Sequence, residues 1–408
     1  MSFGAGPDDE ALKAAWEDFC DRLRAAGDGV FKDANPATSL QRADGFRFLT
    51  QNLSQAFGLA LETKDAAYPA FHAFCGPARK LGSDNADAVY LQAWIDGRFV
   101  YRISGDKGSA RFWNLTIQGH RPDGALHEPF GDTPQANLFG HQLNTDWDGG
   151  FELYVGGAPQ GRNWLPTTPE SRKIFFRQFF DSWDEEPARI RIERVGMDTP
   201  RPIPTPAAMI EAMAWAGRFV GDVVSYWPDF IWGKGQLIDP ESRNRFNAAN
   251  LAASAASAEA GVEDAKRGRF LTQMRWSLQP DEALIIEFDD PRSFWMLTNE
   301  AVFGNSLDYL YRHVSFTPSR TLVDADGRIR LVMTHKDPGY ANWIETQGYR
   351  AGVLTYRNME LMAAPSFHTS TVRVDELGQR LRDSISTDER AEAMRRRFRA
   401  NLRRHALT

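Results

Sequence analysis

Two histidines in the second half of the chain lie beside side chains that could help to move a proton. His335 and Asp337 are two residues apart in MTHKDPG, so they share one face at the end of a predicted strand. His313 follows Tyr309 and Arg312 in LDYLYRHVS. A histidine can transfer a proton near neutral pH, a carboxylate can orient it, and Tyr or Arg can stabilise an oxyanion. These five residues form the candidate catalytic set; the alternative is that LDYLYRHVS is an ordinary strand and they are structural.

Aromatic, amide and charged side chains at turns and strand ends form a wider group of candidate substrate-binding residues. In SDNADAVY, Asp84 and Asn85 either polarise a ligand or cap a turn through Asx hydrogen bonds. Tyr101 and Arg102 alternate across a strand, so only one of them can face a pocket. The candidates in this group are Tyr311, Asn342, Trp343, Asn163, Trp164, Tyr101, Arg102, Asp84 and Asn85.

The sequence lacks the spacings that mark metal and nucleotide sites. Its eight histidines form no HxH, HxxxH or HExxH pattern, and only Cys20 and Cys75 could supply thiolates. It also has no GxSxG elbow, no GxxxxGK[ST] loop and no dinucleotide fingerprint after a strand. We therefore expect no bound metal and no cofactor.

The composition is that of a soluble protein with an excess of aromatic residues. The 408 residues include 12 Trp, 27 Phe and 10 Tyr, and the formal net charge is −6. This charge provides no chain-wide basic field for nucleic acid. No stretch approaches the roughly 18 apolar residues of a membrane span, and the N-terminus lacks a secretory-signal pattern. We expect a cytoplasmic protein without nucleic-acid or membrane partners, and a homo-oligomer remains an open alternative.

Hydrophobic spacing predicts alternating helical and β regions. Helical spacing occurs near residues 8–26 and 44–61, and short β-branched and aromatic segments follow from residue 89. Four prolines between 200 and 206 end this region, and the β pattern returns at 270. The predicted fold class is α+β, with two repeated antiparallel β-sandwich units of jelly-roll type. The predicted segments are an N-terminal helical region (1–80), a first β-sandwich (81–199), a central helical segment (200–268), a second β-sandwich (269–373) and a C-terminal Arg-rich helix (374–408).

The last predicted helix, from Val374 to about His405, is rich in arginine. In RAEAMRRRFRANLRRH, Met394, Phe398 and Leu402 are spaced by four, so we expect them to face the protein and most of the arginines to face solvent. This orientation favours a solvated basic face over a nucleic-acid-binding surface. A further Ala- and Ser-rich helix is predicted over residues 240–266.

The two β regions resemble each other in an ordered series of residues. RFWNLT around Trp113 matches SFWMLT around Trp295, and GRNWLPT matches YANWIET. Arg177 and Arg357 then follow on the next predicted strand. The three matches share a nearly constant separation of about 180 residues, which indicates an internal duplication. In each half, an Asn side chain could cap a loop while the adjacent Trp is buried, a structural corner that needs no catalysis.

Several of these segments resemble the bacterial family named domain of unknown function 1214. In the first half they are GFRFLTQNLSQAFGLALE, KDAAYPAFHAF, KLGSDNADAVYLQAWIDGRFVYRISGDKG and GRNWLP. In the second half they are DEALIIEF, LDYLYRHVS and DADGRIRLVMTHKDPGYANWIETQGYRAGVLTYRN. The resemblance spans most of the chain except the central helices and the Arg-rich tail. It implies a sandwich-like β fold from bacteria, and the family name implies no settled chemistry.

Two functions fit the aromatic excess and the proton-moving residues. One is a cofactor-independent enzyme that acts on a hydrophobic, aromatic or polycyclic small molecule in a catabolic pathway. It would be a lyase, isomerase or hydrolase that uses His, Asp and Tyr for acid–base chemistry. The alternative is a non-catalytic protein that binds such a molecule in the same aromatic cavity. An oligomeric assembly factor, with tryptophans at its interfaces, is a third hypothesis.

Overall fold

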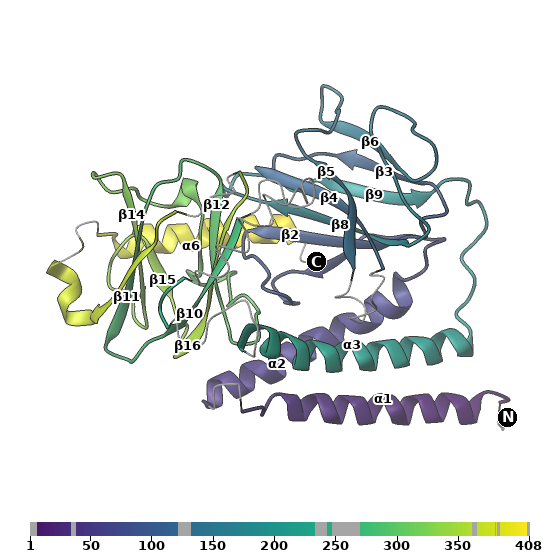
Figure 1. The fold of residues 1–408 in the computed structure, drawn as a ribbon, viewed down its shortest axis with the longest axis horizontal. Helices are drawn as coiled ribbons and strands as arrows, with labels where there is room; N and C mark the ends of the chain where they lie inside the picture. Colours follow the sequence, from purple (N-terminus) through teal and green to yellow (C-terminus); the bar gives the residue numbers. More distant parts are fainter. Residues whose placement is uncertain are drawn as a thin grey trace.

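The chain folds into two β units side by side, with helices packed along one side and one helix crossing between the units (Figure 1). The computed structural model describes residues 6–33, 38–120, 132–232, 243–246, 270–360, 365–379, 381 and 384–405. The predicted helix over 240–266 falls mostly outside these residues.

The first β unit consists of two sheets that enclose an aromatic core. Trp113 lies at its centre, with its ring 5.1 Å from the ring of Phe176 in an edge-to-face arrangement. One sheet has the order β1-β2-β8-β4-β5 and the other β7-β6-β3-β9. The strands are β1 (His72–Cys75), β2 (Ala88–Trp94), β3 (Tyr101–Asp106), β4 (Phe112–Gly119), β5 (Thr133–Phe139), β6 (Gly150–Val155), β7 (Trp164–Leu165), β8 (Ser171–Phe179) and β9 (Arg189–Arg194).

The second β unit repeats this arrangement. Its sheets have the orders β10-β16-β12-β13 and β15-β14-β11-β17. Trp295 takes the place of Trp113, and its ring lies 5.4 Å from that of Phe288, again edge to face. The strands are β10 (Phe270–Ser277), β11 (Glu282–Asp289), β12 (Trp295–Glu300), β13 (Ser315–Phe316), β14 (Arg328–Thr334), β15 (Trp343–Glu345), β16 (Ala351–Asn358) and β17 (His368–Arg373).

The matching strand orders confirm the predicted duplication and the α+β class. Strands β2, β8, β4 and β5 correspond one by one to β10, β16, β12 and β13, and the second sheets correspond in the same way. The sheets are not wholly antiparallel, because β7 pairs with β6 and β15 pairs with β14 in parallel. These short strands follow directly after Asn163 and Asn342, so the parallel pairing belongs to the repeated Asn-Trp corner.

Three helices cover the β1-β2-β8 side of the first unit (Figure 1). They are α1 (Asp9–Gly29), α2 (Ser39–Phe57), which continues into a π-helical turn (Gly58–Glu62), and α3 (Pro206–Trp232). Phe19, Phe48 and Phe219 from the three helices are buried in one core cluster, which explains the apolar spacing of these segments. Among the described residues, no helix is long and apolar enough to cross a membrane.

The C-terminal region differs from the single helix predicted there. Val374–Gln379 forms a 3₁₀ helix, and α6 begins at Thr387 and ends at His405. A capping box explains this start, because Ser386 Oγ accepts a hydrogen bond from Glu389 N and Glu389 Oε2 accepts one from Ser386 N. The helix runs from the second β unit towards the first (Figure 1).

The predicted orientation of α6 is wrong for three of its arginines and for Leu402, although Arg395, Arg396, Arg399 and Arg403 are exposed as expected. Its buried face carries Arg390, Arg397 and Arg404, which are seven residues apart, whereas Leu402 is 36% exposed. The three guanidiniums donate to the carbonyl groups of Tyr340, Arg312 and Ser182, respectively. Burial of these arginines therefore depends on acceptors from distant segments, which the spacing of apolar residues within the helix does not reveal.

A buried polar segment, Lys80–Asp87, joins the two β units. Lys80 Nζ donates to the carbonyl oxygens of Ser306 and Leu307, each at 2.6 Å. Asp84 accepts hydrogen bonds from both the backbone N–H and the hydroxyl of Ser306. Burial lowers the pKa of Lys80 to about 8. The first unit is thus anchored to the second through groups that are withdrawn from water.

Candidate functional site

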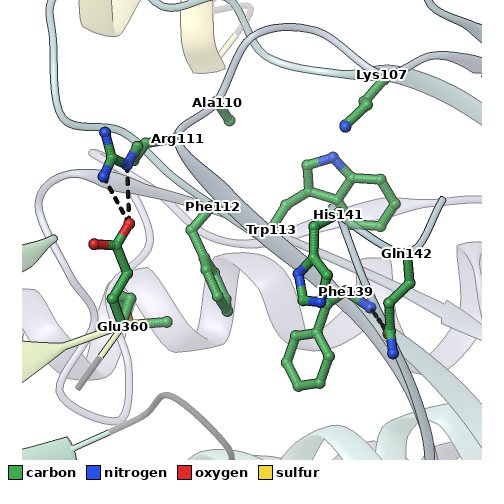
Figure 2. Close-up of a pocket in the computed structure, with 11 residues that line it drawn as sticks. Lys107, Ala110, Arg111, Phe112, Trp113, Phe139, His141, Gln142 and Glu360 are labelled. Carbon is green, nitrogen blue, oxygen red and sulfur yellow. Dashed lines mark hydrogen bonds and ion pairs between the residues drawn. The ribbon is translucent and has the colours of Figure 1, made fainter. Parts of the chain in front are cut away.

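An aromatic pocket of about 530 Å³ lies where the first β unit meets the end of β16 (Figure 2). The turn before β4 contributes Lys107 and Arg111, and the end of β5 contributes Phe139 and His141. Met359 and Glu360 enter from the second β unit. The remaining lining residues are Ala110, Phe112, Trp113, Gly140 and Gln142. Both duplicated units therefore build this pocket.

Flat rings form the floor and one wall of the aromatic pocket. The imidazole of His141 is nearly parallel to the ring of Phe139, with an interplanar angle of 8° and centroids 5.9 Å apart. Figure 2 shows the indole of Trp113 beside these two rings. A Cβ atom at Gly140 would lie 3.2 Å from the Trp113 ring, so glycine allows the chain to pass close to the indole. Trp113 and Phe139 are 2% and 5% exposed, so the exposed imidazole of His141 is the ring that offers a π face to a flat ligand.

The rim of the aromatic pocket carries charge. Arg111 Nη2 lies 2.7 Å from Glu360 Oε1, and Glu360 Oε2 accepts a hydrogen bond from Phe294 N. This ion pair spans the two β units. Lys107 Nζ and the imidazole nitrogens of His141 have no hydrogen-bond partner among the residues described. These groups are available to contact a polar or anionic edge of a ligand.

A second cavity, which we call the arginine pocket, holds about 320 Å³ between α6 and both β units. Trp183 enters from the first unit, and its ring lies under the guanidiniums of Arg320 (4.0 Å) and Arg397 (5.0 Å). Its further lining residues are His313, Ser315, Phe316, Leu322, Ala341, Asn342, Ser384, Ile385, Glu389, Arg390 and Ala393. The arginine pocket is separate from the aromatic pocket, because the two have no lining residue in common.

Two of the candidate catalytic residues lie at the arginine pocket. His313 lines it, and burial, with Arg397 and Arg390 nearby, lowers the pKa of its imidazole to about 3. This histidine is therefore neutral near pH 7, and its Nε2 has no hydrogen-bond partner among the described residues. Asp337 lies behind the lining and pairs with Arg390, with Nε 2.6 Å from Oδ2.

The other three candidate catalytic residues point elsewhere. His335 Nδ1 lies 2.8 Å from Thr346 Oγ1, and its Nε2 lies 3.3 Å from the Leu278 carbonyl. Tyr309 is buried under Lys80, whose Nζ lies 4.6 Å from its ring. Arg312 pairs with Glu345 at 2.8 Å. The five residues therefore do not form one constellation, and their catalytic role stays a prediction.

The Asn-Trp corners make the same hydrogen bonds in both units. Asn163 Nδ2 donates to the carbonyls of Asn144 and Glu152. Asn342 Nδ2 donates to the carbonyls of Leu322 and Arg330. Each Oδ1 accepts from the backbone N–H of the first of these residues, Asn144 or Leu322. Trp164 donates to a backbone carbonyl, whereas Trp343 lies under Arg390 at 5.1 Å.

Replacing Asn342 by alanine is expected to lower the free energy of unfolding by about 2–3 kcal/mol, because buried backbone groups would lose their partners. Asn163→Ala should have an effect of similar size, since it breaks the matching bonds. Urea denaturation of both variants measures these losses. Unchanged stability in both would contradict the structural role of the corner.

The remaining candidate binding residues are occupied by structural contacts. Asn85 Oδ1 accepts from Asp87 N, which is the predicted Asx turn, and Asp84 holds Ser306 as described above. Tyr101 is buried, with its hydroxyl donating to the Ala66 carbonyl, while Arg102 pairs with exposed Glu193. Tyr311 is 58% exposed, and its ring stacks on Phe398 at 5.1 Å. None of these residues lines either pocket.

Sequence reasoning missed most residues of both pockets. Phe139 and His141 come from a segment with no motif, and Trp183 follows β8 in an acidic loop. One available signal was the seven-residue spacing of Arg390, Arg397 and Arg404, which places them on one helix face. Within the described residues, no group of three or more His, Cys, Asp or Glu side chains could hold a metal ion.

Comparisons with known proteins agree with the fold and name no activity. A family model described as "Protein of unknown function (DUF1214)" matches residues 87–180. The crystal structure of an uncharacterised protein from Burkholderia cenocepacia is similar, with 27% sequence identity and a TM-score of 0.79. The alignment covers 89% of this chain and 98% of that protein. The VPA0106 protein from Vibrio parahaemolyticus aligns over 81% of this chain and 98% of its own, at 12% identity and a TM-score of 0.45. No curated protein matches.

Proposed function

Because the description of the family model that matches residues 87–180 states no activity, we propose a function from the pocket geometry. The protein binds a flat hydrophobic small molecule, aromatic or polycyclic, in the aromatic pocket. The observation that carries this proposal is the exposed imidazole of His141, stacked on Phe139, at a cavity of about 530 Å³ whose lining also includes Trp113. Small-molecule sites commonly combine such apolar walls with a few polar groups, in cavities of roughly 300–1,000 Å³.

The rim supports a ligand with an anionic edge. Lys107 supplies an ammonium group without a protein partner among the described residues, and Arg111 lines the opposite side of the cavity (Figure 2). The guanidinium of Arg111 is held by Glu360, so Lys107 is the more available cation. A flat aromatic carboxylate would place its ring against Trp113 and its charge near Lys107.

We expect 2-naphthoate to bind with one molecule per chain, measured by isothermal titration calorimetry. Ala110→Trp should weaken this binding by about tenfold or more, because the indole fills the cavity from its rim. Ala110 is half-buried and lies outside the core clusters, so the fold should tolerate the change. Cyclohexanecarboxylate, which has the charge without the aromatic ring, should bind more weakly.

Ala158→Trp provides the matched control, because Ala158 is an exposed loop residue that does not line the pocket. This variant should bind 2-naphthoate as the wild type does. Equal affinity of Ala110→Trp and wild type, or equal affinity for the two acids, would contradict an aromatic ligand in this pocket.

The second candidate function is acid–base catalysis on the same ligand. The imidazole of His141 favours it, because the ring faces the aromatic pocket and its nitrogens have no partner among the described residues. A substrate proton could then pass to or from this side chain. Mass spectrometry of aromatic and polycyclic acids and alcohols incubated with the protein would detect a product. His141→Gln, His313→Gln and His335→Gln would then identify the proton-transfer group, and binding without any product would exclude catalysis on these compounds.

A further inference from the structure

Three arginines line the arginine pocket: Arg320 pairs with Asp87 and Arg390 with Asp337, but Arg397 has no ion pair of its own among the described residues. Arg320, Arg397 and Arg404 surround Asp87, whose Oδ2 lies 2.6 Å from Arg320 Nη2. Asp87 is 2% exposed. Glu185 and Asp308 contribute negative charge to this group from farther away, near Arg404 and Arg397. Three guanidiniums thus crowd around one fully buried carboxylate in an interior where unpaired charge is expensive.

Anchoring of α6 does not use all of the donors on these arginines. Arg397 donates from Nη1 to the Arg312 carbonyl and from Nη2 to the Ser315 carbonyl, but its Nε has no partner among the described residues. Arg320 Nη1 likewise has none. Both side chains and His313 line the cavity, and these unpartnered nitrogens are buried behind its wall. Burial and the neighbouring Arg320 lower the pKa of Arg397 to about 9, as expected where cations face one another without full compensation.

We propose that the arginine pocket binds the phosphate group of a small organic phosphate monoester. A dianionic head placed among Arg320, Arg397 and His313 would balance the unpaired charge of Arg397 and, after a rotation of these side chains towards it, accept their unused hydrogen bonds. Guanidiniums suit this task, because their fixed N–H groups match the oxygens of a phosphate. A neutral His313 can donate a hydrogen bond without adding charge, provided that the proton resides on Nε2.

The apolar part of the lining leaves room for a short organic group beside the phosphate. Phe316, Leu322 and Ile385 contribute apolar surface, and the whole cavity holds about 320 Å³. Glu389 is the carboxylate in this lining, but it is exposed and its Oε2 is engaged by the backbone and hydroxyl of Ser386. This site is independent of the proposed function, because none of its residues lines the aromatic pocket.

Phenyl phosphate is the probe, and isothermal titration calorimetry at low ionic strength is the measurement. Ala393→Phe should weaken its binding by about tenfold or more, since the new ring projects from α6 into the cavity while all arginines remain. Ala391→Phe is the matched control, because Ala391 is equally half-buried on the same helix but outside the lining. Ala391→Phe and Ala110→Trp should both bind like wild type, and the latter separates this site from the aromatic pocket.

Two further measurements test whether the charge of the phosphate is recognised. Benzoate, a monoanion on the same ring, should bind at least about tenfold more weakly than phenyl phosphate, and added salt should weaken phosphate binding. Arg397→Lys, which keeps the charge but removes the Nε donor, should also weaken it. The proposal is overturned if phenyl phosphate does not bind, if Ala393→Phe binds as wild type does, or if benzoate binds equally well.

Discussion

Replacing Asp87 by asparagine is expected to lower the free energy of unfolding by about 3–5 kcal/mol, the range found when one partner of a buried ion pair is removed. The amide preserves the shape of the side chain but leaves Arg320, Arg397 and Arg404 without their buried counter-charge. Urea denaturation at neutral pH measures the loss. This ion pair connects the first β unit, the second β unit and α6, so the effect should extend to the whole fold.

The contribution of Asp87 to the free energy of unfolding is expected to decrease at acid pH. Burial by itself raises the pKa of this carboxyl, but Arg320 and Arg397 together lower it below its ordinary value of 3.8. The contribution is therefore present in full above pH 3.8 and is lost as the pH falls through the folded-state pKa. Asp87→Asn should lack this acid-dependent component.

Asp184→Asn is the control for Asp87→Asn. Asp184, in the loop after β8, pairs with Arg396 of α6 at 3.3 Å, but both side chains are exposed. Solvent-exposed pairs contribute little to stability, so this variant should unfold like wild type. Equal stability of Asp87→Asn and Asp184→Asn would show that the buried carboxylate does not hold the arginines in place.

Glu300→Gln is expected to make the protein more stable at pH 8, by up to about 3 kcal/mol. Burial raises the pKa of Glu300 to about 7, although Arg357 at 4.0 Å lowers it. The side chains of Thr355 and Ser83 also lower this pKa, but by less than burial raises it. Glutamine removes the buried negative charge while Asp84 remains near Arg357 as a counter-charge.

The pH profile of unfolding tests the Glu300 prediction. Its folded-state pKa is raised above 4.5, so the folded protein binds the proton more tightly between pH 4.5 and about 7. Wild-type stability should fall as the pH rises through this interval, by up to about 1.4 kcal/mol per pH unit from this group. Glu300→Gln should lose that part of the slope, and exposed Glu193→Gln should retain it. An unchanged slope in Glu300→Gln would contradict a buried protonated carboxyl.

More of the fold than of the candidate site could be predicted, because the duplication left matching residues in the two halves of the sequence. Trp113 and Trp295 occupy equivalent core positions, and Asn163 and Asn342 make matching backbone bonds, so both units retain the same residues. The residue pattern of such a corner and of the short strand after it is local, so it can be recognised in the sequence without knowledge of the rest of the fold.

The candidate site depends on which way side chains face, and neighbouring residues of LDYLYRHVS face different surroundings. Tyr309 is buried against Lys80, Tyr311 stacks on Phe398 near the surface, and His313 enters the arginine pocket. This segment is mostly loop, and Ser315, its last residue, is the one that belongs to a strand, β13. The two-residue alternation of a strand therefore does not describe it, and grouping these residues by sequence proximity brought together side chains that the fold separates.

The α6 helix shows why the arginine pocket escaped prediction. Its apolar stripe suggested one buried face, but acceptors from Ser182, Arg312 and Tyr340, together with the ring of Trp183, make another face the buried one. Such partners lie far away in sequence. Apolar spacing reports burial only when the buried surface is itself apolar.

Diffraction from crystals soaked with 6-bromo-2-naphthoate tests the central claim most directly, because the anomalous signal of bromine locates the ligand without ambiguity. The aromatic-pocket account predicts one bromine peak per chain, with the naphthalene ring against Trp113 and Phe139 and the carboxylate towards Lys107. It also predicts no peak there in Ala110→Trp crystals. A peak only in the arginine pocket, or a bound ligand that leaves the Trp113 ring uncontacted, would contradict the account.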